Sequence, residues 1–245
     1  MSDLIETGVE AGVLTLRMNR PDKKNAITQE MYRTMADAIT GAGQDDAIAA
    51  VLICGAPGTF TAGNDIKDFT AVAMSGTPPR DAYDFLIALA TTRKPLVAAV
   101  DGIAIGIGTT ILMHCDLAYA SPASTFRTPF LDLGVTPEAG SSLIAPRIMG
   151  DQRAFALLAL GETFDAEAAR QAGLVYAVSE DAEAAALDAA RRLAKKPPEA
   201  LRIARELLRG SQDEIVKRID REIGHFTERL SSEEAKAAFM AFMSR

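Results

Sequence analysis

Mostly apolar runs alternate with segments of helical periodicity through the first 180 residues of the chain. The runs at 49–54, 96–100 and 116–120 are typical of short strands that are buried on both faces of a sheet. Residues from Thr28 onward, and those at 81–92, repeat apolar positions at helical spacing. Strands that alternate with helices predict β-α-β crossovers and a mainly parallel sheet, so the pattern favours the α/β class.

The remaining elements follow from the same pattern. One strand is expected over 9–19, and the helix that Thr28 caps is expected to end at Gly41 and Gly43. Residues 68–79 lack periodicity and are predicted to form a surface segment. Extended pieces are expected at 125–130 and 174–178, with helices at 152–160 and 165–172 between them. From residue 181 nearly everything is helical, so the sequence divides into a core of residues 1–180 and a helical section of residues 181–245.

Two glycine turns occur where a predicted strand leads into a helix. Gly106 and Gly108 follow the strand at 96–100, and Gly63 follows the strand at 49–54. The first backbone N–H groups of a helix lack partners, and they suit a phosphate or a negative charge that develops during a reaction. The third glycine of a dinucleotide fingerprint and a Gly-Lys-Ser/Thr motif are both absent. Paired backbone donors are therefore favoured, with plain loop geometry as the alternative.

Composition narrows the class of protein. The 245 residues carry a net charge of −7, which argues against a nucleic-acid surface. Cys54 and Cys115 lie in apolar surroundings and are predicted to be thiols rather than a disulfide. The N-terminus lacks a signal pattern, and no apolar run approaches the ~20 residues that span a bilayer. We expect a soluble, cytoplasmic protein without a membrane segment.

Candidate catalytic side chains are few. His114 lies in an apolar helix and is expected to be a core residue, whereas His225 is expected to face solvent or an interface. The sequence contains no metal-ligand cluster and no Gly-x-Ser-x-Gly motif. Glu138 is a lone carboxylate in an uncharged stretch. It is either a glutamate favoured by a helix N-terminus, or an acid–base residue whose pKa apolar surroundings raise.

Four segments in order resemble the crotonase superfamily, also called the enoyl-CoA hydratase/isomerase family, over essentially the whole chain. They are LRMNRPDKKNAIT, FTAGNDIKDF, KPLVAAVDGIAIGIGTTILMHCDLAYAS and TFRTPFLDLGVTPEAGSS. The resemblance implies a crotonase-like spiral of ββα units with a helical C-terminal trimerisation section. It also implies a homotrimer or a dimer of trimers, and a role in fatty-acid metabolism.

The same resemblance implies a site for an acyl-CoA thioester. The backbone N–H groups of Asn64 and Ile107 match the family's oxyanion hole, which holds the thioester oxygen. Residues expected to contact the substrate are Lys24, Ala26, Ala62, Gly63, Asp65, Ile66, Lys67 and Gly106. The adenine is expected near Ala62 and residues 24–26, and Lys67 is expected to approach a phosphate. No separate cofactor is expected, because coenzyme A is part of the substrate.

The acids of the family distinguish its reactions. Hydratases of the family carry two glutamates at positions where this chain has Thr110 and Phe130, which we expect to face the acyl chain instead. Glu138 matches the single catalytic glutamate of peroxisomal-type Δ3,Δ2-enoyl-CoA isomerases. The sequence thus predicts an isomerase that moves a double bond from position 3 to position 2. The alternatives are an enoyl-CoA hydratase or another crotonase-type enzyme, and a non-catalytic acyl-CoA-binding homologue.

Overall fold

The computed structural model describes residues 4–68, 70 and 80–243, so the predicted surface segment at 68–79 lies almost entirely outside the described residues. A six-stranded sheet forms the centre, in the order β1-β2-β3-β5-β7-β10. The strands are β1 (Ile5–Glu10), β2 (Val13–Met18), β3 (Ala50–Gly55), β5 (Leu96–Val100), β7 (Leu117–Ala120) and β10 (Ala177–Val178). All neighbours are parallel except β1 and β2, which confirms the predicted mainly parallel sheet.

The single strand predicted over 9–19 is wrong, because the chain forms the β1–β2 hairpin there. Ala11 and Gly12 adopt left-handed φ angles of 50° and 77°, which reverse the chain between the two strands. Val9 lies on the edge strand β1 and is 57% exposed. Because this apolar residue is not buried, the pattern of apolar residues did not reveal where β1 ends.

A second, four-stranded sheet lies beside the first, in the order β4-β6-β8-β9. Its strands are β4 (Thr59–Thr61), β6 (Ile103–Ile105), β8 (Thr125–Arg127) and β9 (Phe164–Asp165). The pairs β3–β4, β5–β6 and β7–β8 each place one strand in the large sheet and the next strand in the small sheet. Each successive pair advances both sheets by one position, which produces the predicted spiral of ββα units.

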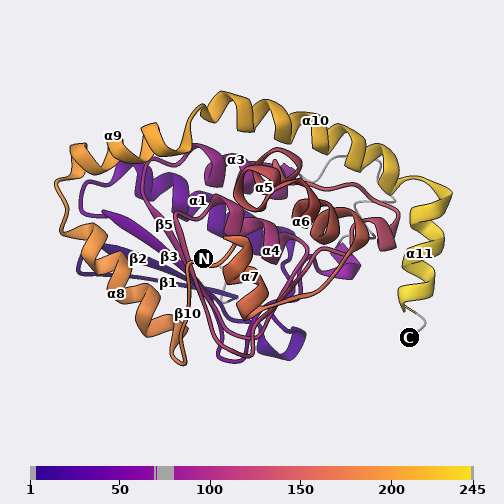
Figure 1. The fold of residues 1–245 in the computed structure, drawn as a ribbon, viewed down its shortest axis with the longest axis horizontal. Helices are drawn as coiled ribbons and strands as arrows, with labels where there is room; N and C mark the ends of the chain where they lie inside the picture. The colour runs from indigo at the N-terminus through magenta and orange to yellow at the C-terminus, as the bar shows by residue number, and fades with distance from the viewer. Residues whose placement is uncertain (1–3, 69, 71–79, 244–245) are drawn as a thin grey trace.

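Helices cover both faces of the large sheet (Figure 1). Val51 and Ile53 of β3 join the core beneath α1 (Gln29–Gln44) and α3 (Arg80–Thr91), whereas Leu52 and Cys54 pack towards α8 (Ala182–Ala194). Alternate side chains of a strand point to opposite faces, which explains why β3 is apolar throughout. The structure confirms that Thr28 caps α1, since its side chain accepts a hydrogen bond from the Met31 N–H.

The prediction that α1 ends at Gly41 and Gly43 is wrong, because the helix continues to Gln44. Ala42 is buried between the two glycines, whereas a Cβ added at either glycine would meet no atom within 4 Å. Packing of the apolar face therefore outweighs the low helix propensity of glycine.

The C-terminal helices arch over the molecule from one end to the other (Figure 1). They are α9 (Pro198–Arg209), α10 (Gln212–Leu230) and α11 (Glu233–Met243). Buried Arg205 anchors α9, because it donates to Asp116 over 2.8 Å and to the Thr92 carbonyl over 2.5 Å. α10 packs against α3 and α5 (Ser141–Met149), and this contact brings a late part of the chain to the centre of the protein.

The other helical segments are short and connect the larger elements. They are η1 (Pro21–Lys23), α4 (Ile107–Thr110), η2 (Ile111–His114), η3 (Leu131–Leu133), α6 (Asp151–Phe155), the π-helical turn η4 (Ala156–Leu160) and α7 (Ala166–Ala172). Among the described residues, no helix is both long enough and apolar enough to cross a bilayer.

Candidate active site

The two glycine turns that the sequence singled out are in direct contact. β4 and β6 pair as parallel strands, so the turns that follow them lie side by side. A Cβ on Gly63, whose φ is 89°, would lie 2.7 Å from the carbonyl oxygen of Ile105. A Cβ on Gly108 would lie 2.5 Å from the Thr61 side chain. Glycine at both positions lets the two turns approach more closely than any side chain would allow.

This approach brings Asn64 and Ile107 to the wall of one cavity. Ile107 is the first residue of α4, so its N–H has no partner inside the helix. Within the described part of the chain, neither N–H donates to another backbone group. The cavity is lined by Gln29, Tyr32, Asn64, Ala82, Leu86, Ile107, Glu138, Ile223, Phe226 and Thr227. The three residues predicted to be catalytic therefore meet in one place.

Glu138 lies in the segment between η3 and α5, and its side chain is buried. Its Oε1 accepts a hydrogen bond of 2.5 Å from the Thr110 hydroxyl. Burial raises the pKa of Glu138 to about 8, and the nearby Glu222 carboxylate raises it too, whereas the Thr110 hydroxyl lowers it. A pKa near neutrality suits a group that must both take up and return a proton.

The backbone next to Glu138 is held in an unusual conformation. Ala139 has a φ of 61°, which is uncommon for a residue with a Cβ. The Nε2 of His114 donates to the Ala139 carbonyl over 2.7 Å. Burial lowers the pKa of His114 to about 4, so the ring is neutral. His114 is buried as predicted, but it is also a polar support for the residue after Glu138.

Tyr32 belongs to the site and was not recognised in the sequence. It occupies the apolar face of α1 beside Met31 and Met35, so its spacing resembles that of a core residue. Its hydroxyl donates to the Asn64 side-chain oxygen over 2.6 Å. A phenol on the buried face of a helix needs such a partner, and that need is the signal that could have revealed it.

The other residues expected to contact the substrate form a neighbouring surface. The Lys24 carbonyl accepts from the Ala62 N–H over 2.8 Å, which joins residues 24–26 to the first glycine turn. Arg20 donates to the Asp65 carboxylate over 2.7 Å and to the Ala26 carbonyl over 3.0 Å. The structure leaves the side chains of Lys24 and Lys67 exposed, while Ile66 is half-buried.

Thr110 and Phe130 do not line the cavity described above. Thr110 is fully buried and contacts the side chain of Glu138, whereas Phe130 is packed in the main core. Gly106 is the N-cap residue of α4 and has a left-handed φ of 56°. Thr110 therefore acts on the substrate site through Glu138.

The described residues contain no group of three or more His, Cys, Asp or Glu side chains that could hold a metal ion. Cys54 and Cys115 are free thiols, as predicted. Burial raises the pKa of each thiol to about 12, so neither is a thiolate at neutral pH.

Comparison with known proteins agrees with this fold. The chain belongs to the enoyl-CoA hydratase/isomerase family, whose sequence model matches residues 8–245. It is 36% identical to rat enoyl-CoA delta isomerase 2 over 96% of the chain, and it spans 62% of the length of that protein. It is also 32% identical to a Mycobacterium tuberculosis protein named probable enoyl-CoA hydratase EchA14, over 99% of the chain and 98% of that protein.

Among solved structures, Pseudomonas aeruginosa OdaA matches with a TM-score of 0.95 and 43% identity over the full length of both chains. These relatives assign the chain to a family of enzymes. Because both isomerase and hydratase names occur among them at similar identity, the particular reaction has to be inferred from the site.

Proposed function

We propose that the protein is an isomerase that moves the double bond of an enoyl-CoA from position 3 to position 2. One observation carries the proposal: buried Glu138 lines the same cavity as Asn64 and Ile107, whose N–H groups donate to no other backbone group in the described part of the chain. This reaction requires one acid–base group that transfers the proton and two hydrogen-bond donors that stabilise the thioester oxygen of the same substrate. The acyl-CoA substrate class is that of the family.

In the proposed reaction, Glu138 removes a proton from C2 of the 3-enoyl thioester. The electron pair of that C–H bond moves into conjugation, and negative charge develops on the thioester oxygen. The N–H groups of Asn64 and Ile107 stabilise that oxygen, and each such donor is worth about 3–4 kcal/mol. Glu138 then returns the proton at C4, so the double bond moves to C2–C3 and the carboxylate is regenerated.

The side chain of Thr110 favours isomerisation over hydration. A hydratase of this family needs a second carboxyl group to activate water, and Thr110 and Phe130 occupy the corresponding positions. Of the described residues that line the cavity, only Glu138 is a carboxylate. One carboxyl group is sufficient to transfer one proton between two carbons of the same substrate.

The proposal includes how coenzyme A binds and how the chain assembles. Its adenine would lie against Ala62 and residues 24–26, with Lys67 near a phosphate. The assembly would be a homotrimer or a dimer of trimers, since α9 carries Leu207 and Leu208 at 79% and 87% exposure. Exposed apolar side chains of this kind mark surfaces that bury against another chain.

The experiment offers the purified protein 3-enoyl-CoA and 2-enoyl-CoA separately. We expect conjugated thioester to form rapidly from the first, with an increase in absorbance, and slow or no hydration of the second. Glu138→Gln should abolish turnover and leave coenzyme A binding unchanged in calorimetry. Fast hydration of 2-enoyl-CoA without isomerisation would contradict the proposal. Coenzyme A binding without turnover of either substrate would indicate the non-catalytic homologue.

A further inference from the structure

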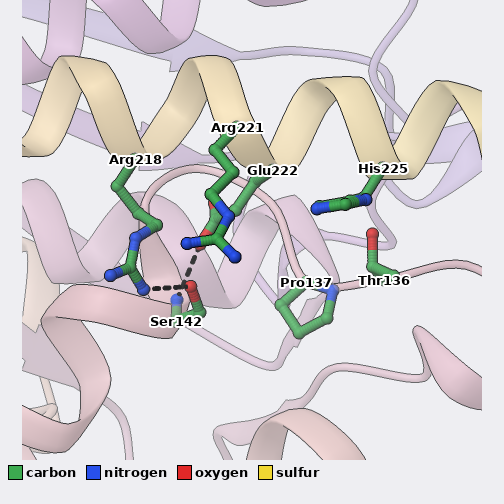
Figure 2. A pocket seen from close by; sticks show the side chains of 7 residues that line it. All are labelled: Thr136, Pro137, Ser142, Arg218, Arg221, Glu222 and His225. Atoms are coloured by element: carbon green, nitrogen blue, oxygen red, sulfur yellow. Dashed lines mark hydrogen bonds between the residues drawn. The ribbon is translucent and has the colours of Figure 1, made fainter.

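Glu222 is a buried carboxylate on α10 that the reaction proposed above does not use. It is 82 positions from Gly140 in the sequence, yet its side chain reaches from α10 to the segment that carries Glu138. Figure 2 shows part of this contact: Glu222 points down from the helix towards Ser142, while Thr136 lies further along, beneath His225. Only 6% of Glu222 is exposed.

The Glu222 carboxylate caps the first turn of α5. Its Oε2 accepts from the Gly140 N–H over 2.5 Å, and its Oε1 accepts from the Ser142 N–H over 2.9 Å. Gly140 is the N-cap of α5 and has no side chain with which to bond these donors. A negative charge at a helix N-terminus is favourable, and here a different helix supplies it.

This contact fixes the strained part of the Glu138 segment. Ala139 and Gly140 both have left-handed φ angles, of 61° and 70°. For Ala139 such a conformation is strained, and it persists only where the surroundings enforce it. His114 holds the Ala139 carbonyl from one side, and Glu222 holds the next N–H groups from the other.

We propose that Glu222 is a positioning residue, which fixes from α10 the backbone that presents Glu138 to the reacting carbon. The inference rests on the proposed function, because it assigns Glu222 a role through Glu138. α10 also supplies Ile223, Phe226 and Thr227 to the wall of the cavity, so one helix shapes the cavity and holds the base.

The charged groups around this contact determine its effect on pH dependence. Arg218, Arg221 and His225 of α10 line the cavity of about 270 Å³ beside Glu222, and Arg218 donates to the Ser142 hydroxyl over 2.9 Å. Tyr32 and Thr110 face Glu138 from the other side, and neutral His114 lies beneath Ala139. The Glu222 charge raises the pKa of Glu138, so removal of the Glu222 charge should lower the pKa of Glu138.

The matched control is Glu214, which also extends from α10 to α5. Glu214 pairs with Arg147 over 2.8 Å, but both side chains are about half exposed and lie at the far end of α5. Glu214→Gln therefore removes a carboxylate from the same helix pair without touching Gly140 or Ser142. We expect it to retain wild-type kinetics and wild-type hydrogen exchange.

The test compares Glu222→Gln and Glu222→Asp with this control. We expect Glu222→Gln to lower kcat about 10- to 100-fold with little change in KM, because the base is displaced. In Glu222→Gln, the acidic limb of the pH profile of kcat should move to lower pH. A loss of stability alone would not cause that change. Glu222→Asp keeps the charge and shortens the reach, so it should lower kcat without moving that limb.

Hydrogen exchange measured on peptides that cover residues 136–145 supplies a readout that needs no turnover. Loss of a bond to a charged group should speed exchange of the Gly140 and Ser142 amides by about tenfold or more in Glu222→Gln. Unchanged exchange together with an unchanged pH profile in Glu222→Gln would overturn the inference. If Glu222→Gln does not fold, unchanged exchange together with an unchanged kcat in Glu222→Asp would overturn it instead. A wild-type protein that does not isomerise 3-enoyl-CoA would instead refute the proposed function, while exchange still decides whether Glu222 holds the segment.

Discussion

Replacement of Glu138 by glutamine should make the folded protein more stable, and more so at higher pH. The carboxyl group has a pKa of about 8 in the folded protein, against an ordinary value of 4.5. Between these values the folded protein keeps a proton on Glu138, whereas the unfolded chain releases it. Stability contributed by this group is therefore fully present below about pH 4.5 and is lost as the pH rises towards 8.

The magnitude follows from the size of the pKa change. Each pH unit in this window lowers the free energy of unfolding by about 1.36 kcal/mol. The wild type therefore loses about 4 kcal/mol of stability between pH 5 and pH 8 through Glu138. Glutamine is similar in shape, can accept the Thr110 hydrogen bond and does not titrate. The stability of Glu138→Gln relative to the wild type should accordingly rise by about 4 kcal/mol over that range.

Urea unfolding at pH 5 and pH 8, followed by circular dichroism, measures this difference. The protein concentration must be the same throughout, since assembly would add to the apparent stability. Glu214→Gln serves as the control, because it removes a half-exposed carboxylate far from Glu138. Its free energy of unfolding should differ from that of the wild type by the same amount at both pH values. The reasoning is refuted if the advantage of Glu138→Gln is the same at pH 5 and pH 8 to within about 1 kcal/mol.

Further predictions concern the groups around the base. Gly63→Ala should lower kcat/KM at least about 100-fold, because the new methyl group meets a carbonyl of the neighbouring turn 2.7 Å away and displaces a donor; steady-state kinetics checks this. Tyr32→Phe should lower kcat about 10-fold as the side chain of Asn64 loses its partner, and an unchanged kcat would contradict that role. Thr110→Val should move the acidic limb of the pH profile up by about one unit, since the ionised form of Glu138 loses a hydrogen bond.

Local sequence signals predicted the parts of the site that local backbone geometry creates. Gly63, Gly106 and Gly108 indicated turns that side chains would block, and the structure places two of them where an added Cβ would clash. The apolar runs predicted β3 and β5 because all their residues are buried. Such features depend on a few neighbouring residues, so a single sequence contains them.

Features that depend on distant residues could not be predicted in this way. Nothing around Glu222 in the sequence indicates that its carboxylate caps α5, because the partners lie about 80 residues earlier. Tyr32 had the spacing of a core residue, and only the folded structure reveals the amide beside its hydroxyl. Thr110 was expected to face the acyl chain, but tertiary packing turns its hydroxyl to Glu138.

The position of α10 has a consequence for how substrate range can change. Ile223, Phe226 and Thr227 form part of the cavity wall, and Glu222 on the same helix bonds the turn after Glu138. A helix moves as a rigid body, so a substitution that shifts α10 to admit a larger acyl group also pulls on that turn. With the proposed roles of Glu138 and Glu222, acyl-chain selectivity and the aim of the base are mechanically linked. Ala82 and Leu86 of α3 then offer the freer route to a different chain length, because Tyr32 of α1 holds Asn64.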